Sequence, residues 1–162
     1  MMNGEIIVRV ADLRVGTGED VLVTVGLGSC VAVALYDPVA RVGGLAHVLL
    51  PSPALSRADP NAAKFPQTAI PHLMELMAKE GARPLRLTGR LAGGASMFAN
   101  LAAPGTIQMG ERNVVACRQV LYAQGIPLIG EAVGGDFGRT VRFRVADGHV
   151  EVSSVAHGVR CL

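Results

Sequence analysis

The chain has 162 residues, which is enough for one domain with a sizeable hydrophobic core. Half of the residues are hydrophobic and only 17% are charged, so the composition excludes a disordered chain. A net charge of +2, carried by scattered basic residues, does not indicate a nucleic-acid partner. Residues 21–36 form an uncharged, mostly apolar run, which falls short of the roughly 20 apolar residues of a membrane helix. Residues 1–13 include acidic side chains and no long apolar stretch, so we expect no signal peptide, no membrane insertion and a cytoplasmic protein.

The first half of the chain is predicted to be mainly β-structure. Short apolar runs predict strands at residues 5–10, 21–25, 30–36 and 42–50. The last two strands flank Asp37-Pro38, a turn signal, and should form a hairpin. A loop rich in Ser, Pro and Ala is expected over residues 51–62.

Helices and strands alternate in the predicted second half. One helix should begin between Pro66 and Pro71 and end at Glu80, and a second should cover residues 110–124. Strands are expected at residues 85–91, 126–133, 141–145 and 150–155, the last two joined by an Asp-Gly turn. The order is mixed α/β with no visible domain boundary, so residues 1–162 are predicted to form a single domain.

One sequence pattern occurs twice. The segments KEGARPLRLTGRLAGG and AQGIPLIGEAVGG both contain a helix end, glycine, Pro-Leu, a strand and Gly-Gly. A duplicated helix–strand unit would produce this pattern, and so would two ordinary helix–strand connections.

The predicted hairpin places Cys30 against His47. If the turn closes so that Tyr36 pairs with Arg41, counting back along both strands pairs Cys30 with His47. Directly opposed residues point to the same face of a sheet, about 4.5–5.5 Å apart at Cβ. A loop one residue longer or shorter would break this register. The hairpin therefore offers a thiol and an imidazole in position to exchange a proton.

Each of these residues also has a structural interpretation. Cys30 follows a Gly-x-Gly-Ser turn, where backbone N–H groups near Ser29, Cys30 and Val31 can hold an oxyanion, yet free cysteines are commonly buried core residues. His47 lies in an apolar strand, where a histidine usually has a purely structural role. Thr24 suits a strand as a β-branched residue, and it is also a candidate to orient His47.

The remaining cysteines and histidines do not form a recognisable metal site. Three widely spaced cysteines give neither a disulfide framework nor a Cys-x-x-Cys pair, and His72, His149 and His157 share no ligand spacing. Cys117 is expected on the inward face of the second helix, and Cys161 near the chain end. The sequence predicts no metal and no organic cofactor. The AGGAS segment is only a weak candidate for a phosphate-binding turn.

Several longer segments resemble one known family. In order and spacing, the segments GLGSCVAVALYDPVARVGGLAHVLLP, RLAGGASMF, MGERNVVACRQVL and EAVGGDFGRTVRF resemble CheD, the chemoreceptor glutamine deamidase of chemotaxis. The resemblance covers nearly the whole chain and implies Cys30 as nucleophile, His47 as general base and acid, and Thr24 as the orienting residue. It also implies an α+β fold like the catalytic domain of the cytotoxic necrotizing factors, with a mixed β-sheet or sandwich core and helices outside.

The resemblance implies a function and partners. The expected reaction is hydrolysis of receptor glutamines to glutamate through a thioester, with the cytoplasmic domain of a chemoreceptor as substrate and a CheC-type phosphatase as a further partner. An alternative is a regulatory binding module that acts on such a phosphatase, with catalysis secondary. Another alternative is a cysteine hydrolase of a different amide or ester.

Three physical expectations follow from a Cys–His pair. The pKa of Cys30 should be lowered, so that Cys30 is alkylated before Cys117. A cleft should lie above the pair, and His47 should line that cleft rather than fill the core. Thr24 should approach His47.

Overall fold

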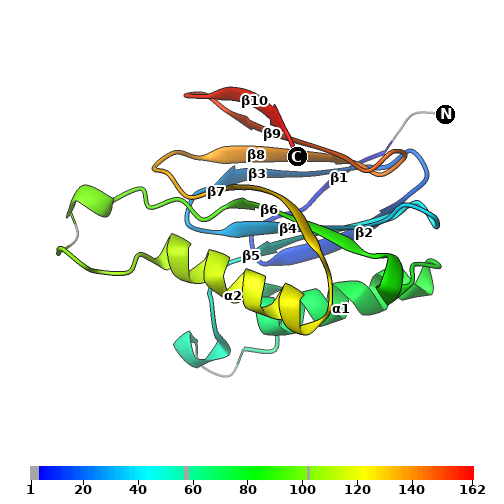
Figure 1. Ribbon diagram of the computed structural model, residues 1–162, viewed down its shortest axis with the longest axis horizontal. Helices are drawn as coiled ribbons and strands as arrows, with labels where there is room; N and C mark the ends of the chain where they lie inside the picture. Colours follow the sequence, from blue (N-terminus) through cyan, green and yellow to red (C-terminus); the bar gives the residue numbers. More distant parts are fainter. Residues whose placement is uncertain (1–3, 57–58, 102) are drawn as a thin grey trace.

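Two five-stranded sheets pack face to face, and two helices cover the outer face of one of them (Figure 1). This computed structural model describes residues 4–56, 59–101 and 103–162. The first sheet has the strand order β1 (Glu5–Ile7), β3 (Val21–Leu27), β8 (Arg139–Arg144), β9 (His149–Ser154), β10 (Gly158–Cys161). The second has the order β2 (Asp12–Thr17), β5 (Val42–Val48), β4 (Val31–Asp37), β6 (Thr88–Gly93), β7 (Leu128–Val133).

Each sheet contains one parallel pair among antiparallel neighbours, so both are mixed. The parallel pairs are β1 with β3 and β6 with β7. The two copies of the repeated sequence pattern supply β6 and β7, which lie side by side. The architecture is therefore α+β, as predicted.

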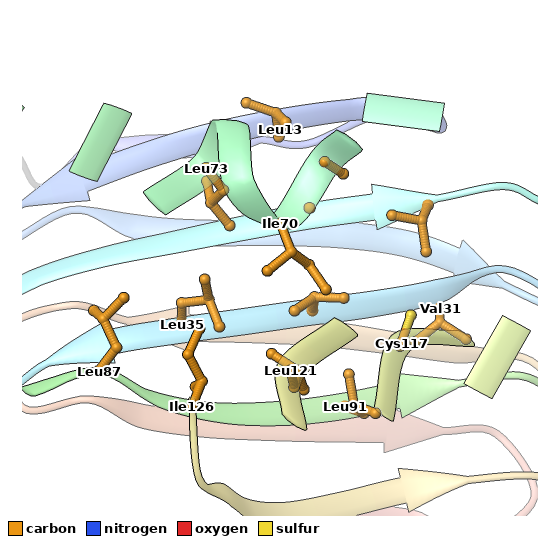
Figure 2. Packing of buried hydrophobic residues seen from close by; sticks show 14 of the residues in the cluster. Leu13, Val31, Leu35, Ile70, Leu73, Leu87, Leu91, Cys117, Leu121 and Ile126 are labelled. Carbon is orange, nitrogen blue, oxygen red and sulfur yellow. The ribbon is translucent and has the colours of Figure 1, made fainter. Parts of the chain in front are cut away.

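The helices are α1 (Pro66–Lys79) and α2 (Met109–Ala123), which confirms both predicted helices to within a few residues. Pro66 occupies the first turn of α1, where its missing N–H costs nothing. Figure 2 shows apolar side chains of both helices, including Ile70, Leu73 and Leu121, packed against Val31 and Leu35 of β4. Their helical spacing gives each helix one apolar face, and burial of that face holds it on the sheet.

Strands β4 and β5 are buried along their whole length because they have a layer on either side. Gly43 and Gly44 allow both layers to approach. A Cβ on Gly43 would lie 2.9 Å from the Phe143 ring, and one on Gly44 would lie 2.8 Å from Leu73. Both distances are shorter than real carbon–carbon contacts, so these positions require glycine for close packing.

Several predicted boundaries were wrong. Strands β2 and β10 were not predicted; both are edge strands with weak apolar patterns. The first strand ends at Ile7, before a turn in which Ala11 has a φ of 56°. The strand expected at residues 85–91 starts at Thr88, because Pro84–Arg86 form a 3₁₀ turn. The loop expected over residues 51–62 contains the 3₁₀ segment Pro53–Leu55, and its residues 57–58 lie outside the described residues.

The β4–β5 hairpin forms, but with a different register from the one predicted. Tyr36 pairs with Gly43 instead of Arg41, and Asp37 pairs with Val42. The turn therefore lies one residue later than expected, because the Asp37 carboxylate accepts hydrogen bonds from the N–H groups of Val39 and Ala40, at 2.9 and 3.1 Å. Arg41 takes the left-handed conformation, with a φ of 54°, that closes this loop. The result is a shift of two residues, which keeps every side chain on its predicted face.

Asp37 is the anchor of this end of the sheet, and its removal should destabilise the protein. Its carboxylate is fully buried, accepts from the Arg83 N–H at 2.9 Å, and pairs with the Arg86 guanidinium at 2.9 Å. Desolvation opposes its charge, but these bonds hold the net pKa of Asp37 below its ordinary value. Replacing Asp37 by alanine should lower the free energy of unfolding by about 3 kcal/mol, since three backbone N–H groups and the Arg86 guanidinium lose their acceptor. Chemical unfolding measures this, with exposed Asp136→Ala as the control that should change little.

Candidate active site

Cys30 lies in the turn between β3 and β4, and the Gly93–Ala95 segment holds this turn in place. Gly94 N–H donates to Cys30 O at 2.8 Å, and Ala95 N–H donates to Gly28 O at 2.9 Å. Gly93 has a φ of 106°, and a Cβ there would lie 2.3 Å from Cys30 O. The AGGAS segment, a weak candidate for a phosphate turn, thus packs against the backbone of the cysteine turn.

His47 and Thr24 meet between the two sheets, which confirms the expected approach of Thr24 to His47. His47 belongs to β5 and Thr24 to β3 of the facing sheet, and both are fully buried. Thr24 Oγ1 lies 2.7 Å from His47 Nδ1 and 2.6 Å from the carbonyl oxygen of Val8. The carbonyl can only accept, so the Thr24 hydroxyl donates to it and accepts from His47 Nδ1–H.

This hydrogen-bond arrangement leaves the other ring nitrogen of His47 as the basic one. With the proton on Nδ1, Nε2 carries the lone pair. Nε2 is buried and has no hydrogen-bond partner among the described residues. The geometry of the threonine therefore sets up a neutral imidazole whose free nitrogen can accept a proton.

Cys30 and His47 share a sheet face, but they are not directly opposed. His47 pairs with Ala32, so the predicted pairing with Cys30 is wrong by two residues. Ala32 and Cys30 both belong to the apolar cluster between the sheets, which is the side to which His47 points. Cys30 immediately precedes β4, two residues before Ala32, so it lies on this side of the sheet near His47 without being paired with it.

Burial keeps both groups uncharged. Burial lowers the pKa of His47 to about 4. Burial also raises the pKa of Cys30, against a smaller lowering by its own backbone N–H. The expected lowering of the Cys30 pKa is thus wrong in direction, because desolvation outweighs the neighbouring donor. Burial raises the pKa of Cys117 as well, and this side chain lies on the inward face of α2, as predicted.

Access to the pair differs from the expected cleft. His47 is fully buried and does not line a cleft, while Cys30 is 9% exposed. A cavity of about 200 Å³ lies beside the cysteine turn and is lined by Ser29, Ser96, Phe98 and Gln108, among others. Its walls come from the segment between β6 and α2, which projects from one end of the molecule (Figure 1). The cavity touches the cysteine turn through Ser29, the residue before Cys30.

Asn113 is a site residue that the sequence analysis missed. It is fully buried in α2, and its Nδ2 donates to Ser29 O at 2.8 Å and to Leu49 O at 3.2 Å. Ser29 precedes Cys30, and Leu49 follows the strand that carries His47. One side chain thus ties the turn of the thiol to the strand of the imidazole. In the sequence, the only signal for this role was a polar asparagine on the apolar face of the predicted second helix, next to Val114.

The other cysteines and histidines stay apart from this site. Cys161 is exposed near the chain end, as expected, and its Sγ lies 3.5 Å from His149 Nε2. His72 lies beside Glu75 on α1, and His157 stacks on Phe137. No group of three or more metal-ligating side chains occurs within residues 4–56, 59–101 and 103–162.

The sequence also matches a described family and its curated relatives. Residues 49–154 match the family described as CheD chemotactic sensory transduction. A relative from Caldanaerobacter subterraneus subsp. tengcongensis is 45% identical over 94% of both chains, and one from Clostridium novyi is 43% identical over 100% of both. Both relatives are named probable chemoreceptor glutamine deamidase CheD.

The chain belongs to the CheD family. Another relative, from Geobacter metallireducens, is 43% identical over 99% of this chain and 100% of its own, and is named probable chemoreceptor glutamine deamidase CheD 2. The matched family region begins after Cys30 and His47, but these full-length CheD relatives span that part too.

Among solved structures, the Bacillus licheniformis hypothetical protein YfiH matches with a TM-score of 0.42. Its sequence identity is 19%, over 69% of this chain and 46% of that chain, a likeness too weak to support an argument. The expected likeness to the cytotoxic necrotizing factor catalytic domain stays a prediction. In the part of the CheD-family chain that the structure describes, no helix is long and apolar enough to cross a bilayer.

Proposed function

We propose that this protein deamidates glutamines of chemoreceptors, with Cys30 as nucleophile, His47 as general base and acid, and Thr24 as the residue that orients His47. The observation that carries the proposal is the 2.7 Å contact between Thr24 Oγ1 and His47 Nδ1. It leaves Nε2 free on the sheet face that Cys30 shares. The names of the full-length relatives supply the substrate.

The reaction begins from a neutral pair. His47 Nε2 takes the Cys30 thiol proton as the sulfur attacks the side-chain carbonyl carbon of the glutamine. Backbone N–H groups of the Gly28–Val31 turn stabilise the oxyanion. The C–N bond breaks, His47 returns the proton to the departing ammonia, and a thioester remains. Water, deprotonated by His47, then cleaves the thioester, so that glutamate and the free thiol are released.

This function implies a setting for the chain. We infer a single domain over residues 1–162, acting in the cytoplasm on the cytoplasmic part of a receptor. Each step uses a protein group or water. A CheC-type phosphatase is a further proposed partner, and regulation of such a phosphatase is the alternative role.

The test is incubation of the purified protein with a receptor cytoplasmic fragment, followed by mass spectrometry of its peptides. Deamidation replaces NH₂ by OH at specific glutamines and releases ammonia. We expect this change without added CheC, which separates catalysis from the regulatory alternative. Unmodified glutamines together with modulation of a CheC-type phosphatase would favour that alternative.

Thr24 should affect the rate without supplying chemistry. In Thr24→Val the hydroxyl is lost at nearly constant volume, and His47 loses the acceptor that holds its Nδ1–H. We expect kcat to fall about 10–100-fold, because a misoriented base reacts less often. Thr24→Ser keeps the hydroxyl and is the matched control that should retain most activity. Equal activity of the valine and serine variants would contradict the orienting role.

The two hydrogen bonds of Asn113 should be needed for full catalytic activity. Asn113→Asp keeps the shape of the side chain but, when ionised, turns both bonds to Ser29 O and Leu49 O into repulsions. Because a protonated carboxyl can still donate one of these bonds, kcat of this variant should rise as the pH falls from neutrality. Thermal melts at each pH separate this from unfolding. A variant with wild-type kcat at neutral pH would show that the tie is dispensable.

A further inference from the structure

A second cavity lies beside the start of β8, the end of β9 and strand β10. Its volume is about 230 Å³, and its walls include Arg139, Ser153, Ser154, His157 and Arg160. The lining thus combines two arginines, two serines and a histidine with the apolar residues Ala132, Phe137 and Val152. The proposed deamidation steps use none of these groups.

Arg139 is largely buried, and both of its side-chain hydrogen bonds, to Gly134 O and Phe137 O, come from one guanidinium nitrogen. It is only 6% exposed, and its Nη1 donates to Gly134 O at 2.7 Å. Its guanidinium carbon lies 4.1 Å from the centre of the Phe137 ring, whose other neighbour is the His157 ring at 4.2 Å. No other nitrogen of Arg139 has a hydrogen-bond partner among the described residues. These remaining donors are not among the buried unpaired atoms of the described residues, so they are open to solvent and available to an acceptor that enters the cavity.

Nothing in the described chain neutralises this cavity. Within the described residues, neither Arg139 nor Arg160 forms an ion pair, whereas Arg86, Arg118, Arg142 and Arg144 all do. Burial lowers the pKa of Arg139, and the positive charge of Arg160 lowers it further. The two arginines thus repel each other across a space that a negative group would fill.

This cavity is connected to the cysteine turn by one side-chain hydrogen bond of Arg139 and two backbone hydrogen bonds. Gly134 accepts from Arg139 and donates its N–H to Gly93 O at 3.0 Å. The next residue, Gly94, donates to Cys30 O at 2.8 Å. Arg139 also starts β8 opposite Leu27, which ends the strand that carries Thr24. The cavity and the thiol therefore lie at the same end of the two sheets.

We propose that this cavity is an anion-binding subsite for a carboxylate side chain of the polypeptide substrate, near the glutamine to be deamidated. The inference rests on the proposed function. A guanidinium presents paired donors that match a carboxylate, and the Ser154 hydroxyl, which accepts from His157 N–H, keeps its own proton to donate. A free inorganic anion has the same chemistry and is the other source to be separated.

The test compares Arg160→Gln with the wild type on two receptor fragments. One fragment keeps its native acidic residues, and in the other the acidic residues flanking the target glutamine are alanine. Arg160 is exposed, so this variant should fold. Loss of one charge-assisted contact should raise KM for the native fragment about tenfold, with the main effect on KM. The neutralised fragment should show no such dependence on Arg160.

Arg83→Gln is the matched control, since it removes an exposed arginine at the Asp37 end of β4. It should leave KM unchanged for both fragments. Equal KM values for wild type and Arg160→Gln on the native fragment would overturn the proposal.

Thermal melts with inorganic phosphate at constant ionic strength form a second arm, which needs no deamidase activity. Phosphate should raise Tm of the wild type and of Arg83→Gln more than that of Arg160→Gln. A different outcome is that phosphate raises Tm of the wild type more than that of Arg160→Gln while KM is the same for the native and the neutralised fragments. This outcome would overturn the substrate carboxylate as the ligand in favour of a free anion. Absence of deamidation by the wild type with a positive phosphate arm would instead refute the proposed function and retain the anion site.

Discussion

Replacing Cys30 by alanine is expected to abolish deamidation of a receptor fragment. A thioester requires a thiol, and Cys30 is the thiol beside His47. Without it, His47 cannot provide a covalent intermediate for hydrolysis. Cys30→Ser should also lose at least about 10³-fold in kcat, because a hydroxyl is far harder to deprotonate than a thiol at neutral pH. Release of ammonia and the mass of the target peptide measure both variants.

Two controls separate chemistry from folding in this experiment. Cys30 is small and at the edge of the core, so thermal melts of the alanine and serine variants should resemble that of the wild type. Cys161→Ser removes the exposed thiol and should retain activity. Activity that survives in Cys30→Ala, or that disappears only because the variant unfolds, would show that Cys30 is a structural residue.

Replacing His47 by asparagine should remove the base but keep the bond to Thr24. The asparagine amide can donate to Thr24 Oγ1 as Nδ1–H does, so the local packing should persist. We expect kcat to fall about 10²–10⁴-fold, the usual contribution of general acid–base catalysis. Alkylation of Cys30 by iodoacetamide should slow in the same variant, and in the wild type Cys30 should still react before the fully buried Cys117. Unchanged kcat in His47→Asn would exclude His47 as the base.

The pH dependence of the wild type should carry the signature of the same histidine. Because burial lowers the pKa of His47 to about 4, the neutral base is present well below pH 6.5, and the acid limb of kcat/KM should lie near pH 4. Stability follows the same shift. The unfolded chain binds this proton near pH 6.5 and the folded chain near pH 4, so stability is full above pH 6.5 and is lost as the pH falls through this window.

The size of this stability loss is about 3 kcal/mol, and His47→Asn should lack it. Unfolding by urea at a series of pH values between 4 and 7 measures the slope in both proteins. An acid limb near pH 6.5, or equal pH slopes in wild type and variant, would contradict a buried neutral His47.

The local elements were predictable because their signals are local. Apolar spacing and glycine stops defined α1 and α2 to within a few residues. The Asp-Pro turn between two apolar runs predicted the β4–β5 hairpin, and the motifs around Cys30 and His47 pointed to the family that the full-length relatives show. Edge strands β2 and β10 lacked such a signal, because most of their side chains are exposed or half-buried and need not be apolar.

By itself, the sequence determined which side chains share a face and which residue types are available for chemistry. A period of two along the strand put Cys30 and His47 on one side, and this survived a register shift of two residues. The tertiary structure alone decided the contact of Thr24 with His47, because it joins two sheets through residues far apart in the chain. It also decided the raised pKa of Cys30 and the place of Asn113, since burial and long-range hydrogen bonds depend on how the layers pack and leave no pattern in the neighbouring residues.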